Sequence, residues 1–525
     1  MRRNQSALGL LLVLLLLSLA CARLAAPWAG PSTPNRPATL SPRVTPPASN
    51  SAAATALPKV APTAFPKVGP TALPIAAPTG LPAAPPTAFP TAVPSPTLPP
   101  GFYRAQSGDT LTGLAARFNV VTDTLLVHNP GLPLTQTIAP GTLLDLHDLP
   151  EPAGAYANRL LPDSEVVYSP GTEQFDVRSF VLAQPGFLST YTETLSADPP
   201  GSPPRAGWEI VDRYARSYSI NPRLLLALLE YQARALSDPA PDEFRRQYPL
   251  GAISSQMLPG LSHQLGWVCN QLNYGYYGWR TAAPPKPFTI GPVPLQVSPT
   301  LNAGTFALVW VLGQLYARPD FKPENLAAVY RRLFGDPFAR AIDLLPGALT
   351  QPPFQLPFEP GKIWSFTSGP HPAYGTTLPF SALDFAPHME QSGCVTSTDW
   401  VTAVAAGGIA FSGDGRVELD LGNGWTVVYL HIASFERIPA GASVNAGDRL
   451  GHPSCEGGNA TGTHVHVSRR YRGEWIPADG FAPFVMSGWV VHGGPRPYQG
   501  YLSRGGQTVS ACPCADETTL IQLEP

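Results

Sequence analysis

The chain has 525 residues, too many for one hydrophobic core, and typical domains of about 100–200 residues predict several domains. Its 64 prolines are far more than the average usage of about 5% would give for this length, and they gather near the N-terminus. The formal net charge of -2 argues against a protein that binds polyanions, which would carry a strongly basic face. We therefore expect no nucleic-acid partner, and we expect that any substrate is recognised by its shape and by hydrogen bonds.

The first segment has the features of an export signal. Two arginines precede an apolar run that ends at Ala20 and is shorter than the ~20 residues that span a bilayer. We predict that residues 1–21 are a signal peptide. The run ends in "LLSLAC", which resembles the lipidation motif of bacterial lipoproteins, although Ser18 replaces the usual leucine. Two outcomes stay open: lipidation of Cys21, which would anchor the chain to a membrane, or ordinary secretion.

Residues 22–101 are rich in proline, alanine and threonine. They contain an eight-residue repeat, seen in "PTAFPKVG" and "PTALPIAA". Dense proline removes backbone donors and favours extended polyproline II, so this segment cannot form a core. We predict a linker, either a spacer that sets reach or a tether without a specific length.

The character of the sequence changes at residues 102–149. "SGDTLTGLAARFNV" predicts a loop and a helix, Val121 to His128 a second helix, and "IAPGTLLDL" a turn and strand. This β-α-α-β order, with "GDTL" and "NP", resembles the LysM module. The resemblance implies binding of N-acetylglucosamine-containing glycans such as peptidoglycan. A generic small α/β domain would explain the leucines but not these two motifs together.

Residues 150–350 read as mainly helical. Helix starts are predicted at four places: near Ala206, at Asn221-Pro222, near Asn302 and at Pro323. "NPRLLLALLEYQARAL" resembles the early helix of lysozyme-like transglycosylases. Gln232 occupies the position of their general acid, and Glu230 lies about 200° away around the helix. Because glutamine cannot donate the proton that glycoside cleavage needs, we predict a degenerate lysozyme-like domain. The aromatic run "NYGYYGWR" is interpreted as packing.

Six of the ten histidines lie between His371 and His466. "VELDLGNGWTVVYLHIA" predicts a β-hairpin that ends at His431. His464 and His466 stand two residues apart in a predicted strand and so share one face. Asp384 stands between apolar residues in "SALDF", where a carboxylate is costly to bury unless it is paired or binds a cation. His371 lies in a predicted Gly/Pro-rich loop.

Two histidines and an aspartate with an open fourth position form the ligand set of a catalytic zinc. Residues 355–480 resemble the zinc metallopeptidases that include lysostaphin and the LytM-type enzymes. Their first histidine usually precedes the aspartate by four residues, a position held here by Phe380. The wider spacing and the segments "SGPH", "YLH" and "CEGGNATGTHVH" resemble the beta-lytic and staphylolytic branch.

This resemblance implies an antiparallel all-β peptidase domain that binds one Zn²⁺. Its metal ligands would be His371, Asp384 and His466. His431 and His464 would be catalytic, as general base and as electrophilic or proton-shuttling partner, in an order the sequence leaves open. His388 and His452 are interpreted as bystanders.

An exported chain can keep disulfides. Cys394 and Cys455 lie on either side of the part of the histidine-rich segment that contains His431, and we predict that they pair. The other cysteines are not assigned. Residues 481–525 predict short strands with glycine turns, without a function of their own.

Together these features predict a multidomain, monomeric, exported protein of the cell envelope or extracellular space. We interpret it as a zinc endopeptidase that hydrolyses peptide bonds of peptidoglycan, with the LysM module holding the glycan. The alternative is an inactive peptidoglycan-binding regulator of another wall hydrolase. A third interpretation, a lysozyme-like glycan cleaver, is disfavoured by Gln232.

Overall fold

A computed structural model describes most of the chain from residue 101 onwards. The described residues are 99, 101–149, 152–196, 198, 201–252, 259–281, 289–290, 293–316, 321–388, 393–395 and 397–524. The predicted signal peptide and nearly all of the predicted linker lie outside them. Within these residues, no helix has the length and apolar character needed to cross a membrane.

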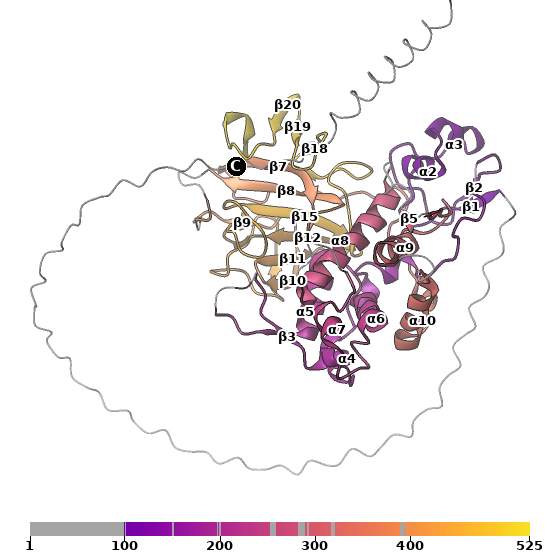
Figure 1. Cartoon of the computed structure of the whole chain (residues 1–525). Helices are drawn as coiled ribbons and strands as arrows, with labels where there is room; N and C mark the ends of the chain where they lie inside the picture. Colours follow the sequence, from indigo (N-terminus) through magenta and orange to yellow (C-terminus); the bar gives the residue numbers. More distant parts are fainter. Residues whose placement is uncertain are drawn as a thin grey trace, which may run out of the picture. The chain divides into compact units, whose positions relative to one another are not determined.

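The first described domain has the predicted β-α-α-β order (Figure 1). Its elements are β1 (Phe102–Arg104), α2 (Leu111–Phe118), α3 (Thr122–His128) and β2 (Leu143–Asp145). The Thr110 side chain caps α2 by accepting a hydrogen bond from the Gly113 backbone N–H, which satisfies a donor that the helix leaves free. Leu111, Leu114 and Phe118 then face a small core together.

Seven α-helices follow within the described residues. They are α4 (Val177–Leu182), α5 (Gly207–Tyr218), α6 (Pro222–Ala233), α7 (Glu243–Gln247), α8 (Leu261–Arg280), α9 (Ala303–Leu315) and α10 (Pro323–Phe334). The four predicted starts correspond to α5, α6, α9 and α10. The Asn221 side chain caps α6 and Pro222 occupies its first turn, where a missing N–H costs nothing.

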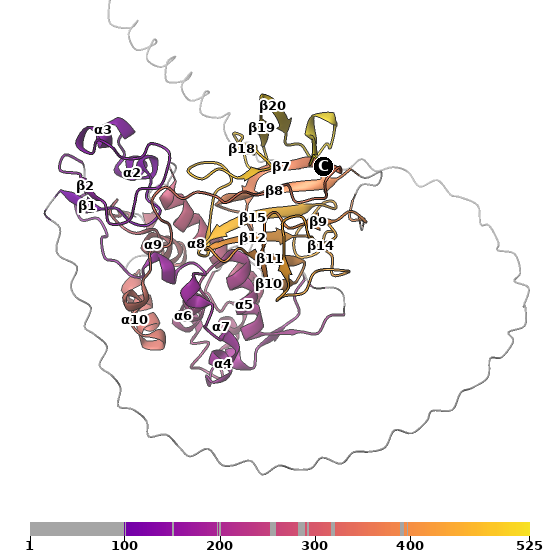
Figure 2. The same cartoon turned by 180° about the vertical axis from the view of Figure 1, so that it is seen from behind.

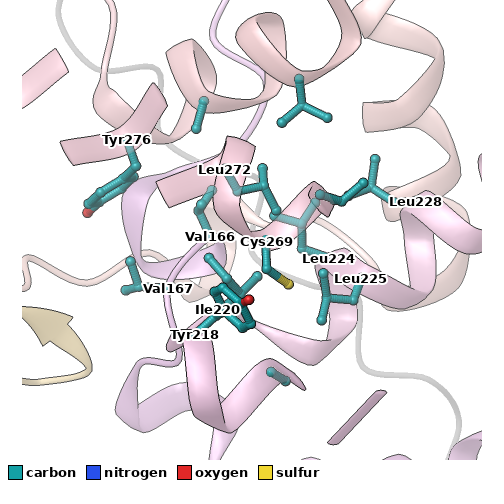
Figure 3. Close-up of a cluster of buried hydrophobic side chains, with 14 of the residues drawn as sticks. Val166, Val167, Tyr218, Ile220, Leu224, Leu225, Leu228, Cys269, Leu272 and Tyr276 are labelled. Atoms are coloured by element: carbon teal, nitrogen blue, oxygen red, sulfur yellow. The ribbon is translucent and has the colours of Figure 1, made fainter. Parts of the chain in front are cut away.

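The helices share one apolar core, part of which Figure 3 shows with Leu224, Leu225 and Leu228 of α6 beside Leu272 of α8. The sequence analysis did not predict the 20-residue α8, whose last turns contain the aromatic run. Trp279 of this run is buried and stacks on Phe306 of α9, with ring centroids 4.1 Å apart. The packing interpretation is therefore confirmed for this ring.

Nine strands of the C-terminal third form one antiparallel sheet in the order β13-β10-β11-β12-β15-β8-β7-β21, with β16 paired to β15 (Figures 1 and 2). The bounds are β7 (Ile363–Pro372), β8 (Phe380–Pro387), β10 (Gly407–Gly413), β11 (Arg416–Asp420), β12 (Trp425–Leu430), β13 (Ser443–Val444), β15 (Val465–Tyr471), β16 (Glu474–Trp475) and β21 (Leu520–Gln522). The predicted hairpin corresponds to β11 and β12.

Side chains alternate between the two faces of this sheet, as the strand period of two requires. Val465 and Val467 of β15 enter the core of the peptidase region. The intervening residues of β15 point to the opposite face, which carries His466. Sequence alternation thus places the histidines on one face and the core of the peptidase region on the other.

The helical region covers part of the face that carries His466. Trp425, Leu430 and Trp475 of the sheet belong to the core formed by the helices. The Trp475 indole N–H donates to the Tyr218 carbonyl at 3.1 Å. Figures 1 and 2 show α5 and α8 as the helices nearest the strands. The two regions therefore share buried surface.

The C-terminal extension forms the predicted short strands. β17 (Val485–Met486), β18 (Trp489–Gly493), β19 (Gly500–Arg504) and β20 (Gln507–Ser510) make a four-stranded sheet. The last strand, β21, pairs with β7 of the main sheet. Short two-stranded pairs complete the structure: β3 (Thr192–Glu193) with β4 (Arg205–Ala206), β5 (Thr289–Ile290) with β6 (Val293–Pro294), and β9 (Val401–Thr402) with β14 (Arg449–Gly451).

The predicted disulfide between Cys394 and Cys455 is present, across a sequence separation of 61 residues. A second disulfide joins Cys512 to Cys514, and Cys269 is a buried free thiol.

We expect the double variant Cys394→Ala/Cys455→Ala to lose about 4 kcal/mol of unfolding free energy, because the bridge closes a long loop in the unfolded chain. Urea denaturation followed by circular dichroism measures this loss. The matched control is Cys512→Ala/Cys514→Ala, whose loop spans two residues and should cost much less. Equal losses in the two variants would contradict the loop-closure argument.

Candidate metal centre

Three neighbouring strands carry the predicted metal ligands. Asp384 of β8 and His466 of β15 are directly opposite in the strand register. His371 lies near the end of β7, opposite Ala382 of β8. The expectation that His371 lies in a loop is wrong: the Gly/Pro-rich segment is the bulged end of a strand, with register shifts between Ser368 and His371.

The nitrogen and oxygen atoms of these residues form a nearly regular triangle. His371 Nε2 lies 3.0 Å from His466 Nδ1, and each nitrogen lies 3.3 Å from Asp384 Oδ1. Ligand atoms about 2.0–2.2 Å from a tetrahedral zinc lie roughly 3.3–3.6 Å apart. The three residues are buried and form the group best arranged to hold an ion in the described part of the chain.

Backbone carbonyls fix the tautomers of both histidines. His371 Nδ1 lies 2.9 Å from the Gly369 carbonyl, and His466 Nε2 lies 3.0 Å from the Ala373 carbonyl. A carbonyl accepts and never donates, so these two nitrogens carry the protons. The other two nitrogens then present lone pairs to each other at 3.0 Å. A cation between them removes the repulsion, and this pattern is typical of metal-binding histidines.

Asp384 supplies a second reason for a cation. Its Oδ1 is buried and accepts no hydrogen bond. Burial alone would raise the pKa of this carboxyl, but the imidazoles of His371, His466 and His464 hold that pKa well below its ordinary value. In turn, burial opposes the protonation of His371, yet the Asp384 charge raises the pKa of that imidazole. The carboxylate is thus an anion that needs positive charge beside it.

The two predicted catalytic histidines lie beside this triangle. The rings of His431 and His464 are 4.5 Å apart between centroids, and His464 Nε2 lies 3.7 Å from Asp384 Oδ1. His431 Nδ1 lies 2.9 Å from the Glu456 carbonyl, and His464 Nδ1 lies 2.7 Å from the Gly462 carbonyl. Each carbonyl fixes the proton on Nδ1 and leaves Nε2 with a free lone pair.

His431 is held in an unusual backbone conformation at the end of β12. Its φ is +63°, a left-handed backbone conformation that residues other than glycine rarely adopt. The flanking chain fixes it: Ser454 N donates to the His431 carbonyl at 2.7 Å, and Ile432 N donates to the Gly415 carbonyl at 3.0 Å. Burial lowers the pKa of His431 to about 3, and His464 and His466 add to the effect. Its imidazole is therefore neutral at ordinary pH.

Tyr498 of the C-terminal extension is a site residue that sequence reasoning missed. Its ring stacks on the His371 ring with centroids 4.7 Å apart and an interplanar angle of 19°. Tyr498 N donates to the Pro370 carbonyl, and Gly369 N donates to the Tyr498 carbonyl. Burial raises the pKa of the half-exposed phenol, and so does the charge of Asp384. No spacing signal in the sequence links this tyrosine to the histidines.

His388 and His452 lie outside the triangle, in agreement with their interpretation as bystanders. His388 is exposed after the end of β8. His452 is buried, but its ring nitrogens contact the Asp399 carbonyl at 2.9 Å and the Glu436 carboxylate at 3.0 Å.

Three family models match successive parts of the chain. The LysM domain matches residues 103–146, the N-terminal domain of LasA matches 159–347, and peptidase family M23 matches 391–477. The M23 match includes His431, His464 and His466 but begins after Asp384, so the roles of His371 and Asp384 rest on geometry.

Curated relatives agree with these matches. Protease LasA of Pseudomonas aeruginosa is 28% identical over 400 residues, which cover 68% of this chain and 88% of that protein. The beta-lytic metalloendopeptidase of Lysobacter enzymogenes is 29% identical over 168 residues, which cover 29% of this chain and 89% of that protein. Among solved structures, the deep-sea M23 metalloprotease pseudoalterin is 25% identical, with a TM-score of 0.28, and covers 31% of this chain and 96% of that chain.

The matched domains follow the order that the sequence predicted, a LysM module, a helical region and a sheet-rich peptidase. The chain is therefore a LysM-containing metallopeptidase with a domain of peptidase family M23, homologous to protease LasA and to the beta-lytic metalloendopeptidases.

Proposed function

We propose that the protein is an exported zinc endopeptidase that hydrolyses peptide bonds in peptidoglycan. The observation that carries the proposal is the triangle of His371 Nε2, Asp384 Oδ1 and His466 Nδ1, with two further imidazoles beside it. The LysM domain supports a wall polymer as substrate, and the names of the beta-lytic relatives support endopeptidase chemistry. The presence of all five residues favours this function over that of an inactive regulator.

In this proposal His371, Asp384 and His466 hold one Zn²⁺ per chain. Two nitrogens and one oxygen suit zinc and leave a fourth position open, as catalytic sites do. When bound, the ion lowers the pKa of a water molecule to about 7 and polarises the scissile carbonyl. The carbonyls of Gly369 and Ala373 hold the two imidazoles in the orientation that binding requires.

His431 and His464 are proposed as the proton-transfer groups. Each imidazole is oriented by a backbone carbonyl that accepts a hydrogen bond from its Nδ1, so its Nε2 points away from that carbonyl. One of them accepts a proton from the attacking water and the other stabilises charge or delivers a proton to the leaving amine. Because the rings lie close together, either assignment is compatible with the geometry.

The helical region is proposed to be non-catalytic, and its lysozyme-like character stays a prediction. The Gln232 amide oxygen accepts a hydrogen bond from the Tyr316 hydroxyl. Glu230 is buried and is occupied by the Leu236 N–H at 3.0 Å and the Arg332 guanidinium at 3.2 Å. A carboxylate held in this way is not free to protonate a glycosidic oxygen.

Export, a monomeric state and the choice between lipidation of Cys21 and secretion also remain proposals. Substrate chemistry supports export, because peptidoglycan lies outside the membrane. Disulfides support it too, since they persist in oxidising compartments.

Metal analysis tests the ligand assignment. We expect about one zinc per chain in the wild type, little in His371→Ala, and full zinc but at least ~100-fold slower hydrolysis in His464→Ala, because general acid–base groups contribute about 10²–10⁴-fold. Plasma emission spectrometry measures the metal, and release of new amino termini from peptidoglycan measures cleavage. The exposed His388→Ala is the matched control and should retain both. Full zinc in His371→Ala would refute the assignment.

A second prediction concerns the aromatic contact of His371. We expect Tyr498→Ala to weaken zinc affinity by about 10-fold or more, the usual cost of losing a group that orients a ligand, whereas Tyr498→Phe keeps the stacked ring and the affinity. Competition with a chromogenic chelator measures the affinity. Tyr501→Ala is the control, because Tyr501 is similarly exposed and stacks on His492 instead. Equal affinities in all variants would exclude a positioning role for Tyr498.

A further inference from the structure

A pocket of about 390 Å³ lies where the LysM domain, the helical region and the peptidase region meet. Thr110 and Leu134 line it from the LysM loops, Tyr277 from α8, and Trp475 and Phe481 from β16 and the segment after it. Its volume falls in the range of about 300–1,000 Å³ that holds small ligands. The pocket is separate from the metal centre, since none of the metal-centre residues lines it.

The LysM domain and the helical region, which both line this pocket, are joined by buried and partly buried hydrogen bonds. The Leu345 N–H donates to the Ser107 hydroxyl at 2.7 Å, and the Thr137 hydroxyl donates to the Pro346 carbonyl at 2.7 Å. The Gln106 amide donates to the Thr300 carbonyl at 2.8 Å. The LysM domain is therefore docked on the helical region, and the pocket is preformed.

Arg280 lines the pocket and joins all three regions. Its guanidinium donates to the Ser107 carbonyl of the LysM domain, to Asp163 of the helical region at 2.8 Å, and contacts Glu474 of the peptidase region at 3.0 Å. The carboxylates of Asp163 and Glu474 are paired with the guanidinium, so Arg280 offers no unpaired charge to an anionic ligand. The exposed Asp479, which also lines the pocket, accepts hydrogen bonds from the backbone N–H groups of Gly480 and Gly493. The chemistry of the pocket favours an uncharged ligand.

Aromatic and aliphatic walls with a few hydroxyls suit a sugar ring. The C–H face of a pyranose packs on a partly exposed ring such as that of Phe481, with the buried Trp475 behind it, while its hydroxyls bond to polar atoms at the edge. Thr110 and Thr112 place hydroxyls there from the LysM side, and Thr135 from the opposite loop. A peptide would leave its charged or amide groups against the apolar walls.

We propose that this pocket is a composite saccharide site, in which the peptidase and helical regions complete a sugar-binding surface begun by the LysM loops. The inference rests on the proposed function, because the saccharide would belong to the glycan strand of the same substrate. Trp475 is paired with Arg470 of β15, the strand that carries His466. A glycan held here lies at a fixed distance from the metal centre, so binding would set which attached peptide reaches the zinc.

The test is isothermal titration of the full-length protein with chitotetraose, a soluble N-acetylglucosamine tetramer. We expect saturable binding by the wild type and at least ~10-fold weaker binding in both Leu134→Ser and Phe481→Ala, since each variant loses an apolar side chain that the bound sugar would cover. Leu134 is 64% exposed, so its replacement should not disturb folding. Val127→Ser is the control: this LysM residue is 76% exposed and lies outside the pocket.

Weaker binding in Leu134→Ser with unchanged binding in Phe481→Ala would overturn the composite site and leave a site within the LysM loops. The absence of saturable binding in the wild type would overturn it as well. Phe481→Leu keeps the packing without the flat ring, and it tests the same contact if Phe481→Ala does not fold. Cleavage of a glycan-free peptide by the zinc-loaded protein should be unchanged in every variant, which separates a failure of this inference from a failure of the proposed peptidase function.

Discussion

The functional part of this protein depends on one electrostatic constraint, a carboxylate buried between imidazoles whose lone pairs face one another. Asp384 Oδ1 lacks a hydrogen-bond donor, and His371 Nε2 and His466 Nδ1 lie 3.0 Å apart with their protons committed to backbone carbonyls. Without a cation this arrangement is unfavourable, because an uncompensated charge is costly in a low-dielectric interior. The surrounding sheet maintains it through strand pairing, which leaves the side chains little freedom to separate.

A second constraint organises the chain at a larger scale. The Arg280 side chain is 9% exposed and bonds to groups from the LysM domain, the helical region and the peptidase region. Its five donors make an arginine suited to such a junction. The helical region also shares an apolar core with the sheet, so these domains are packed against one another rather than joined only by linkers. The composite pocket is a consequence of that docking.

Local patterns predicted much of the fold. Strand alternation placed His464 and His466 together and located the hairpin that ends at His431. The start signals Asn221-Pro222, Asn302 and Pro323 located α6, α9 and α10, and the start of α5 was predicted near Ala206. The long helix α8 was missed although Leu261, Leu265, Val268 and Leu272 recur at helical spacing, because its glycines and asparagines are typical of turns and have low helix propensity. His371 was expected in a loop because glycine and proline are typical of turns, yet strand pairing with β8 kept the segment in a bulged strand.

The sequence by itself determined which residues are the candidate metal ligands, since the residue types and the order of the motifs can be read without the fold. It also determined the order of the domains and the pairing of Cys394 with Cys455. The tertiary structure decided which nitrogen of each histidine is free, because the carbonyls that hold the protons come from the folded backbone. It decided the contact of Tyr498 with His371 and the walls of the composite pocket, which join residues distant in the chain. Such contacts depend on packing between elements, and short-range sequence patterns carry no information about it.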